Sequence, residues 1–163
     1  MRMELIQPFI NAADAILAQT LNAPTTMGEL TMEEEAYRRK GVAAMVRVAG
    51  DIEGRVIFDL EPATAKDVTS KLVGGDGDPD MVPEAICELA NQVIGNAVTV
   101  LNDQGFHFKV MPPEIHTAEQ GAHNTEDTEA LVMCFETVSG TVFMNIAMHY
   151  NRRRRGEGAA AAD

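Results

Sequence analysis

One predicted helix carries polar side chains at a spacing that could support chemistry. Over residues 81–103, two carboxylates, two carboxamides and a glycine recur at helical intervals. At about 100° per residue they form one exposed stripe, opposite an apolar arc. A carboxamide accepts a hydrogen bond through its oxygen while its NH₂ donates another. The stripe consists of Glu84, Glu88, Asn91, Gly95 and Asn102.

Gly95 is the member of this stripe that a helix does not favour. Glycine inside a helix costs about 1 kcal/mol relative to alanine. Its exposed position is explained if another molecule must approach that backbone closely. A plain solvated helix face has the same spacing, so the residues alone leave both interpretations open.

Other catalytic and metal-binding patterns are not supported. The four histidines have no pair at i, i+4 and no neighbouring Cys-x-x-Cys, which argues against a zinc site. Asp76, Asp78 and Asp80 begin like a calcium loop, but Met81 and Cys87 stand where an EF-hand needs glycine and glutamate. The glycine-rich stretch before the helix lacks the Gly-Lys-Ser/Thr of a P-loop, and no Gly-x-Ser-x-Gly occurs. We therefore expect no metal site in this chain.

The two cysteines, Cys87 and Cys134, lie within apolar patterns and do not form a disulfide framework. We expect both to be reduced core thiols. Cys87 has no nearby basic residue to lower its pKa, so a thiolate nucleophile is not supported. The sequence shows neither a signal peptide nor an apolar stretch long enough to span a bilayer, and we expect a cytoplasmic protein.

Length and charge exclude several classes of function. The 163 residues suit one ordinary domain. Lys and Arg number 13 and Asp and Glu 25, so the formal charge is −12. Such an acidic body repels phosphate backbones and anionic lipid, so we expect neither nucleic-acid nor membrane binding. With 5% aromatic residues, no Trp and 10 Met, the core should be aliphatic, with methionines filling its gaps.

The elements that would position the stripe can be predicted from periodicity and turn residues. Apolar spacing predicts helices over residues 4–21, 62–73 and 81–103, the last closed by Gly105. Two pairs of β-rich runs, each around a turn, predict hairpins. A further strand should end at Pro112-Pro113, and an edge strand is one interpretation of residues 25–35. The predicted hairpins cover residues 42–60 and 131–150, the further strand 106–110, and a polar loop 119–129.

This order of elements predicts the α+β class, with a largely antiparallel sheet of hairpins packed against helices. Residues 1–150 should form a single domain. Residues 151–163 change composition abruptly, to four arginines and then a Gly/Ala-rich end. We expect this tail to be disordered.

The stripe helix resembles the signature helix of the CheC/CheX/FliY phosphatases of bacterial chemotaxis. Glu88 and Asn91 match the Glu-x-x-Asn core of that signature, while Glu84 stands where the family has Asp or Ser. Pro112 and Pro113 follow near the separation usual for the family's proline, and the segment that ends in them resembles CheX proteins. CheC types commonly carry two such motifs. The single motif, the chain length and the element order are similar to CheX, over residues 1–150.

The resemblance implies a phosphatase that removes phosphate from the phospho-aspartate of a CheY-like response regulator. By analogy with the water-orienting glutamine of small GTPases, Asn91 would position the attacking water. Glu88 would pair with a lysine of the regulator, and Gly95 would belong to the partner-binding surface. Glu84 would either extend that surface or simply be solvated. Mg²⁺ would arrive bound to the regulator, so this chain would need no cofactor of its own.

The sequence leaves two points open. A CheX-like module without catalysis, which binds a regulator or acts as a scaffold near the flagellar switch, is the alternative function. CheX relatives form homodimers by joining sheet edges, so the resemblance implies a homodimer here. The last predicted strand, over residues 141–150, could supply that edge or lie inside the core.

Overall fold

The computed structural model describes residues 3–33, 40–75, 78–117 and 129–151. Its helices begin and end close to the predicted positions. Pro62 is the first residue of α2, where its missing N–H has no intrahelical partner to lose. A single 3₁₀ turn, η1, leads into α3. The bounds are α1 Met3–Leu21, α2 Pro62–Val73, η1 Pro79–Met81 and α3 Val82–Asp103.

The strands form one sheet in which every described pair is antiparallel. Their order is β1-β7-β8-β4-β3-β5, with β2 beside β7 and β6 beside β3. The predicted α+β class with an antiparallel sheet is confirmed. The bounds are β1 Thr26–Met27, β2 Thr31–Glu33, β3 Val42–Gly50, β4 Ile52–Leu60, β5 Phe108–Val110, β6 Glu114–Thr117, β7 Ala130–Thr137 and β8 Gly140–Tyr150.

Both predicted hairpins are present, and they meet in the middle of the sheet. The strand pairs β3–β4 and β7–β8 form the hairpins, and β8 also pairs with β4 along the whole length of β4. The last strand is therefore a central core strand and not an edge. In the described sheet the outer positions belong to β1 and β2 on one side and to β5 and β6 on the other.

Strand β6 was not predicted. Pro112 and Pro113 interrupt the strand after Val110, as expected, but the chain then pairs with β3 again from Glu114 onward. An edge strand tolerates such an interruption, because only one of its sides pairs with a neighbour, so a proline on the other side or at a break costs no hydrogen bond of the ladder. The two prolines thus divide one edge into β5 and β6.

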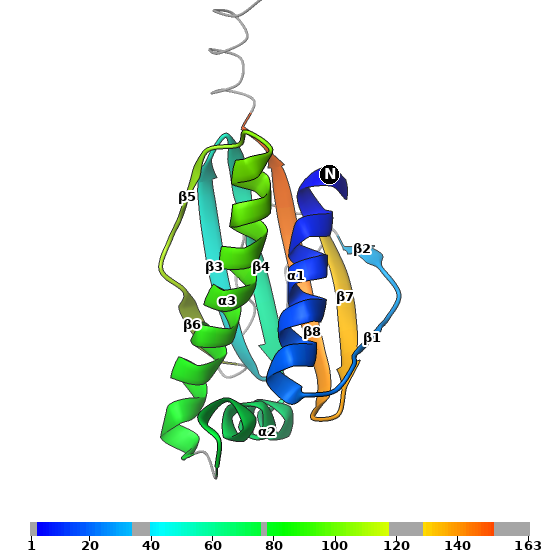
Figure 1. The fold of residues 1–163 in the computed structure, drawn as a ribbon, viewed down its shortest axis with the longest axis vertical. Coiled ribbons are helices and arrows are strands. Elements are labelled where there is room, and N and C mark those ends of the chain that lie inside the picture. Colours follow the sequence, from blue (N-terminus) through cyan, green and yellow to red (C-terminus); the bar gives the residue numbers. More distant parts are fainter. Residues whose placement is uncertain (1–2, 34–39, 76–77, 118–128, 152–163) are drawn as a thin grey trace, which may run out of the picture.

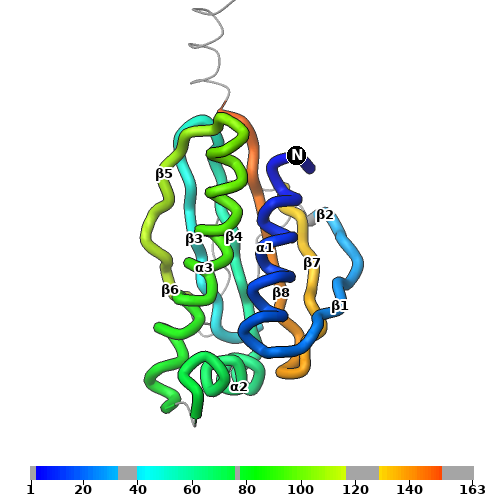
Figure 2. The backbone as a smooth tube through the Cα atoms, in the orientation of Figure 1, coloured from blue at the N-terminus to red at the C-terminus, as the bar shows by residue number. Residues whose placement is uncertain are grey.

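Helices α1 and α3 lie side by side over one face of the sheet, and α2 crosses one end of that layer (Figures 1 and 2). The core between these layers is aliphatic and methionine-containing apart from Phe9, Phe58 and Phe135. Burial of this apolar surface is the main force that holds the helices on the sheet.

The remaining predictions are tested in part. Residues 25–35 do supply short edge strands, β1 and β2, along the outer side of β7 (Figure 2). The predicted loop, apart from Glu129, and the predicted tail beyond Asn151 lie outside the described residues. Among the described helices, none is both long and apolar enough to cross a membrane.

Candidate functional site

Helix α3 is fixed in its rotation by one apolar face. That face packs on α1, α2 and the β3 side of the sheet, and its side chains are almost fully buried. Because side chains three or four positions apart share a face, burial of this set turns the opposite stripe to solvent. The buried set is Ile86, Leu89, Ala90, Val93, Ile94, Ala97 and Leu101.

All members of the predicted stripe are exposed along α3. Glu88 and Asn91 lie one turn apart, with Glu84 one turn before them and Gly95 one turn after. A Cβ atom added to Gly95 would have no heavy atom within 4 Å, so nothing in the described part of the chain requires a glycine there. Thr99 donates a hydrogen bond from its hydroxyl to the Gly95 carbonyl, at 3.0 Å.

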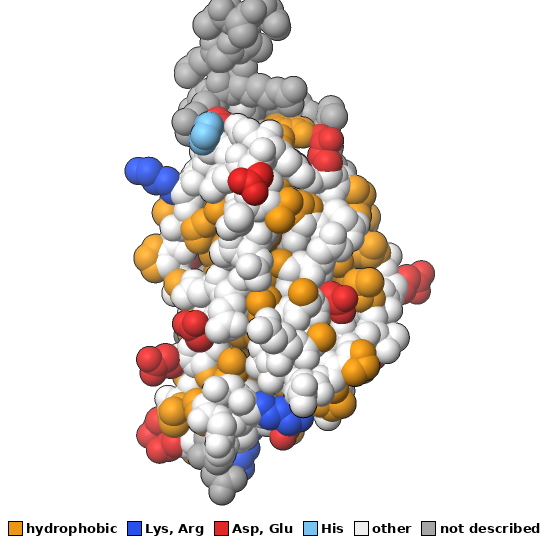
Figure 3. Space-filling model, in the orientation of Figure 1, with side chains coloured by type: hydrophobic (Ala, Val, Ile, Leu, Met, Phe, Trp, Pro, Cys, Tyr) orange, Lys and Arg blue, Asp and Glu red, His pale blue; other side chains and the backbone are white. Residues whose placement is uncertain are grey.

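The N-terminal half of the stripe carries uncompensated negative charge. Within the described residues, neither Glu84 nor Glu88 has an ion-pair partner. Like charges four positions apart on a helix repel each other by a few tenths of a kcal/mol, about 0.2–0.5. In Figure 3, acidic side chains lie beside this half of α3, whereas basic side chains are seen over α2. The surface is therefore suited to a partner that brings a cation.

Gln92 is a neighbour of the site that sequence reasoning missed. Its side-chain Nε2 donates a hydrogen bond to Oε1 of Glu88, at 3.2 Å, and both side chains are exposed. The signal was present in the sequence, because residues four apart on a helix face each other.

Cys87 is half-buried on the same helix and is not set up as a nucleophile. Burial raises the pKa of its thiol, and the nearby Glu84 carboxylate raises it further. Both effects keep the sulfur protonated, in agreement with the sequence argument. Among the described residues, no three His, Cys, Asp or Glu side chains come together as a metal site would require.

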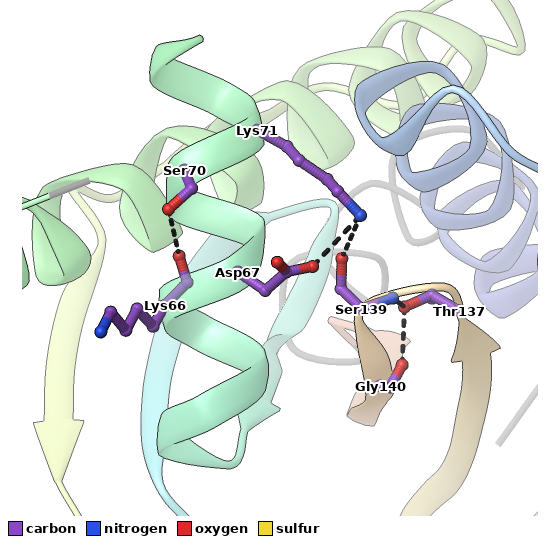
Figure 4. Close-up of polar contacts among 7 residues, drawn as sticks. All are labelled: Lys66, Asp67, Ser70, Lys71, Thr137, Ser139 and Gly140. Atoms are coloured by element: carbon purple, nitrogen blue, oxygen red, sulfur yellow. Dashed lines mark hydrogen bonds and ion pairs between the residues drawn. The ribbon is translucent and has the colours of Figure 1, made fainter. Parts of the chain in front are cut away.

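A second cluster joins α2 to the turn between β7 and β8 (Figure 4). Lys71 Nζ lies 3.1 Å from both Asp67 Oδ2 and Ser139 Oγ. Hydrogen bonds from Ser139 and then Lys71 lower the pKa of Asp67. The turn is held by Thr137, whose hydroxyl donates to the Gly140 carbonyl and accepts from the Ser139 N–H. Within this cluster the charges of Asp67 and Lys71 pair with each other, and the contacts with Ser139 fasten α2 to the sheet.

Two buried polar groups elsewhere also have internal partners. Arg55 on β4 donates from its guanidinium to the side-chain oxygen of Asn145 on the neighbouring β8, and both are buried. The buried Asp59 carboxylate accepts the backbone N–H groups of Lys40 and Gly41, at 2.6 and 3.1 Å. The first contact joins two neighbouring strands, and the second holds the backbone just before β3. We therefore assign both to the stability of the fold and not to a functional site.

Comparison with known proteins points to one family. A family model described as "Chemotaxis phosphatase CheX" matches residues 42–136, which include all of α3 with Glu88 and Asn91. No match was found among curated proteins.

Solved structures share this fold over nearly their whole length. A CheC-like superfamily protein from Shewanella sp. PV-4 has 20% identity and a TM-score of 0.78, covering 91% of this chain and 99% of that one. The chemotaxis protein CheX from Vibrio vulnificus has 18% identity and a TM-score of 0.76, covering 90% and 99%. A chain of the CheX–CheY–BeF₃–Mg²⁺ complex from Borrelia burgdorferi has 30% identity and a TM-score of 0.72, covering 91% and 99%.

Proposed function

Since the chain belongs to the CheX family of chemotaxis phosphatases, we propose that it hydrolyses the phospho-aspartate of a CheY-like response regulator. The similar Borrelia burgdorferi structure is a complex of CheX with CheY, which supports a regulator of that kind as the partner. In the proposed reaction water attacks phosphorus, the acyl-phosphate bond breaks, and the regulator's aspartate and inorganic phosphate are released.

Asn91 positions the water in this proposal. An acyl phosphate is already reactive, so the enzyme mainly has to hold one water in line with phosphorus. The Asn91 side-chain oxygen accepts a hydrogen bond from that water, and its NH₂ donates to an oxygen of the phosphorylated aspartate. The exposed position of Asn91 near the middle of α3 supports this role, because a partner's phosphoryl group can reach it.

Glu88 docks the regulator by pairing with a lysine beside the phosphorylated aspartate. A carboxylate next to an anionic phosphoryl group is repulsive unless a cation lies between them. Glu84 extends the same acidic surface, and Gly95 allows the partner's backbone or side chains to approach the helix closely. In this proposal Mg²⁺ arrives bound to the regulator.

The observation that carries the proposal is the pairing of an exposed carboxamide with an exposed carboxylate that has no ion-pair partner within the described chain. On α2, by contrast, the Asp67 carboxylate is already paired with Lys71 and is not available to a partner in the same way.

The test is phosphate release from a phosphorylated CheY-like regulator at a tenfold excess over the protein. We expect multiple turnovers with the wild type and a loss of about 100-fold in kcat with Asn91→Ala, the scale on which misplaced reactants slow a reaction. Unfolding by urea should be unchanged within about 0.5 kcal/mol, because the residue is on the surface. Equal turnover by the variant would contradict the role of Asn91.

The same measurement separates the alternative function. A non-catalytic module that binds a regulator or acts as a scaffold would bind the activated regulator without accelerating phosphate release. Glu84 at the position where the family has Asp or Ser is the feature that favours that alternative.

A homodimer remains a prediction, and the sheet restricts how it would form. Because β8 is central, two sheets would join through β1 and β2 or through β5 and β6. Met27, Leu30 and Met32 are about half exposed along the first of these edges. We propose that edge, since pairing would cover both its apolar side chains and its unpaired backbone. A monomeric molar mass in solution would contradict it.

A further inference from the structure

Gln92 holds one oxygen of the Glu88 carboxylate. Its Nε2 donates to Oε1 at 3.2 Å, and this is the one hydrogen bond of the Glu88 side chain within the described residues. Both side chains are exposed and lie one helical turn apart. We infer that Gln92 is a positioning residue, which presents Glu88 to the response regulator. The inference rests on the proposed function.

The order of residues around α3 keeps this contact clear of the proposed reaction. At about 100° per residue, Asn91 lies about 60° to one side of Glu88 and Gln92 about 40° to the other. Gln92 can therefore reach the carboxylate without covering the carboxamide of Asn91. The second carboxylate oxygen, Oε2, is left for the partner.

A neutral donor is the suitable group at this position. A lysine four residues after a glutamate forms a favourable ion pair on a helix. Such a lysine would neutralise the charge that docking needs and would compete with the lysine of the regulator. The amide of Gln92 carries no charge, so it orients the carboxylate and leaves its full negative charge available. Orienting a side chain before association lowers the entropy lost on binding.

Glu84, one turn before Glu88, also helps to orient the Glu88 side chain. The two carboxylates are one turn apart, and neither forms an ion pair within the described chain. Their repulsion disfavours rotamers that turn Glu88 toward the N-terminus of α3, which is the same bias that the hydrogen bond from Gln92 imposes.

The experiment compares two glutamines that make the same kind of contact. Gln92→Met keeps the length of the side chain and removes the donor. Gln7→Met is the matched control, because Gln7 on α1 donates to Asn11 at the same i, i+4 spacing, at 2.8 Å. Gln92→Lys adds the competing cation.

We expect Gln92→Met to raise KM for a phosphorylated CheY-like regulator about threefold with kcat unchanged, and Gln92→Lys to raise it about tenfold with a weaker dependence on salt. Gln7→Met should leave both constants as in the wild type. The dissociation constant for a regulator activated by BeF₃⁻ and Mg²⁺ should rise in step with KM.

The outcomes separate this inference from the proposed function. A wild type that turns over, together with a Gln92→Met variant that behaves like Gln7→Met, overturns the inference alone. A wild type that binds the activated regulator without turnover overturns the proposed catalysis, and weaker binding by Gln92→Met would then still support the inference. A wild type that neither binds nor hydrolyses overturns both.

Discussion

Helices α2 and α3 both carry acidic residues at the surface of the same layer, but the acidic side chains of the two helices differ in their partners. On α2, Asp67 is paired with Lys71 and accepts a hydrogen bond from Ser139 on the neighbouring turn. On α3, Glu84 and Glu88 have no ion-pair partner in the described chain. The first arrangement stabilises the fold, whereas the second leaves charge available for another molecule.

The glycines of the two regions show the same contrast. A Cβ atom on Gly140, in the turn that α2 covers, would lie 2.2 Å from the Thr64 hydroxyl oxygen, and the residue has φ 127. Internal packing therefore requires that glycine. At Gly95 on α3 the described residues set no such requirement. An internal reason for a residue type points to folding, whereas an exposed glycine inside a helix leaves its backbone open to close approach.

The largest expected effect is on stability: replacing the two glycines by alanine should change the free energy of unfolding in opposite directions. Gly140→Ala should lower the free energy of unfolding by about 1–3 kcal/mol, because it adds both a clash and an unfavourable φ. Gly95→Ala should raise it by about 1 kcal/mol, because alanine favours the helix. Urea unfolding of the two variants beside the wild type measures both changes.

The same two glycine variants should differ in the opposite way in their KM. We expect Gly140→Ala to keep KM for the phosphorylated regulator and Gly95→Ala to raise it several-fold, since the added methyl group keeps the partner from the helix. Asn96→Ala, exposed on the flank of α3, is the control for helix propensity and should leave KM unchanged. If Gly95→Ala gains stability at no cost in KM, the stripe is not closely approached there.

Charge reversal in each region is the next prediction. Glu88→Lys should raise KM at least tenfold, about 1.4 kcal/mol, because it replaces attraction of the regulator's lysine by repulsion. Stability should stay the same or rise slightly, since the new lysine follows Glu84 by four residues. Asp67→Lys should lower stability and leave KM unchanged. Equal KM for Glu88→Lys and the wild type would remove Glu88 from the docking surface.

The contrast also explains what the sequence could predict. The bounds of α2 and α3 follow from Pro62, Pro83 and Gly105, and the exposed stripe follows from the apolar periodicity of one helix. These are local patterns. The ladder of β6 was missed because Pro112 and Pro113 end a strand locally, while the resumed pairing depends on the neighbouring β3.

The internal clusters could not be predicted for the same reason. The contact of Lys71 with Ser139 joins positions 68 residues apart, and that of Arg55 with Asn145 joins positions 90 apart. Each exists only once the sheet order is set. The hydrogen bond from Gln92 to Glu88 is different, because it lies within one helix and its i, i+4 spacing was visible.

The smallest effect concerns the pH dependence of the α2 cluster. The pKa of Asp67 is lowered in the fold, so unfolding takes up a proton at pH values between its folded and unfolded pKa. Its contribution is present above its unfolded pKa and is lost as pH falls through the folded pKa. Because both side chains are more than a third exposed, the ion pair is worth about 0.2–1 kcal/mol. Asp67→Asn should thus have a lower free energy of unfolding than the wild type at pH 7, and this difference should shrink at pH 3. Lys71→Met should lower the free energy of unfolding at pH 7 in a similar way.

A difference in unfolding free energy that stays constant across this range would show that the carboxylate charge does not fasten α2 to the turn.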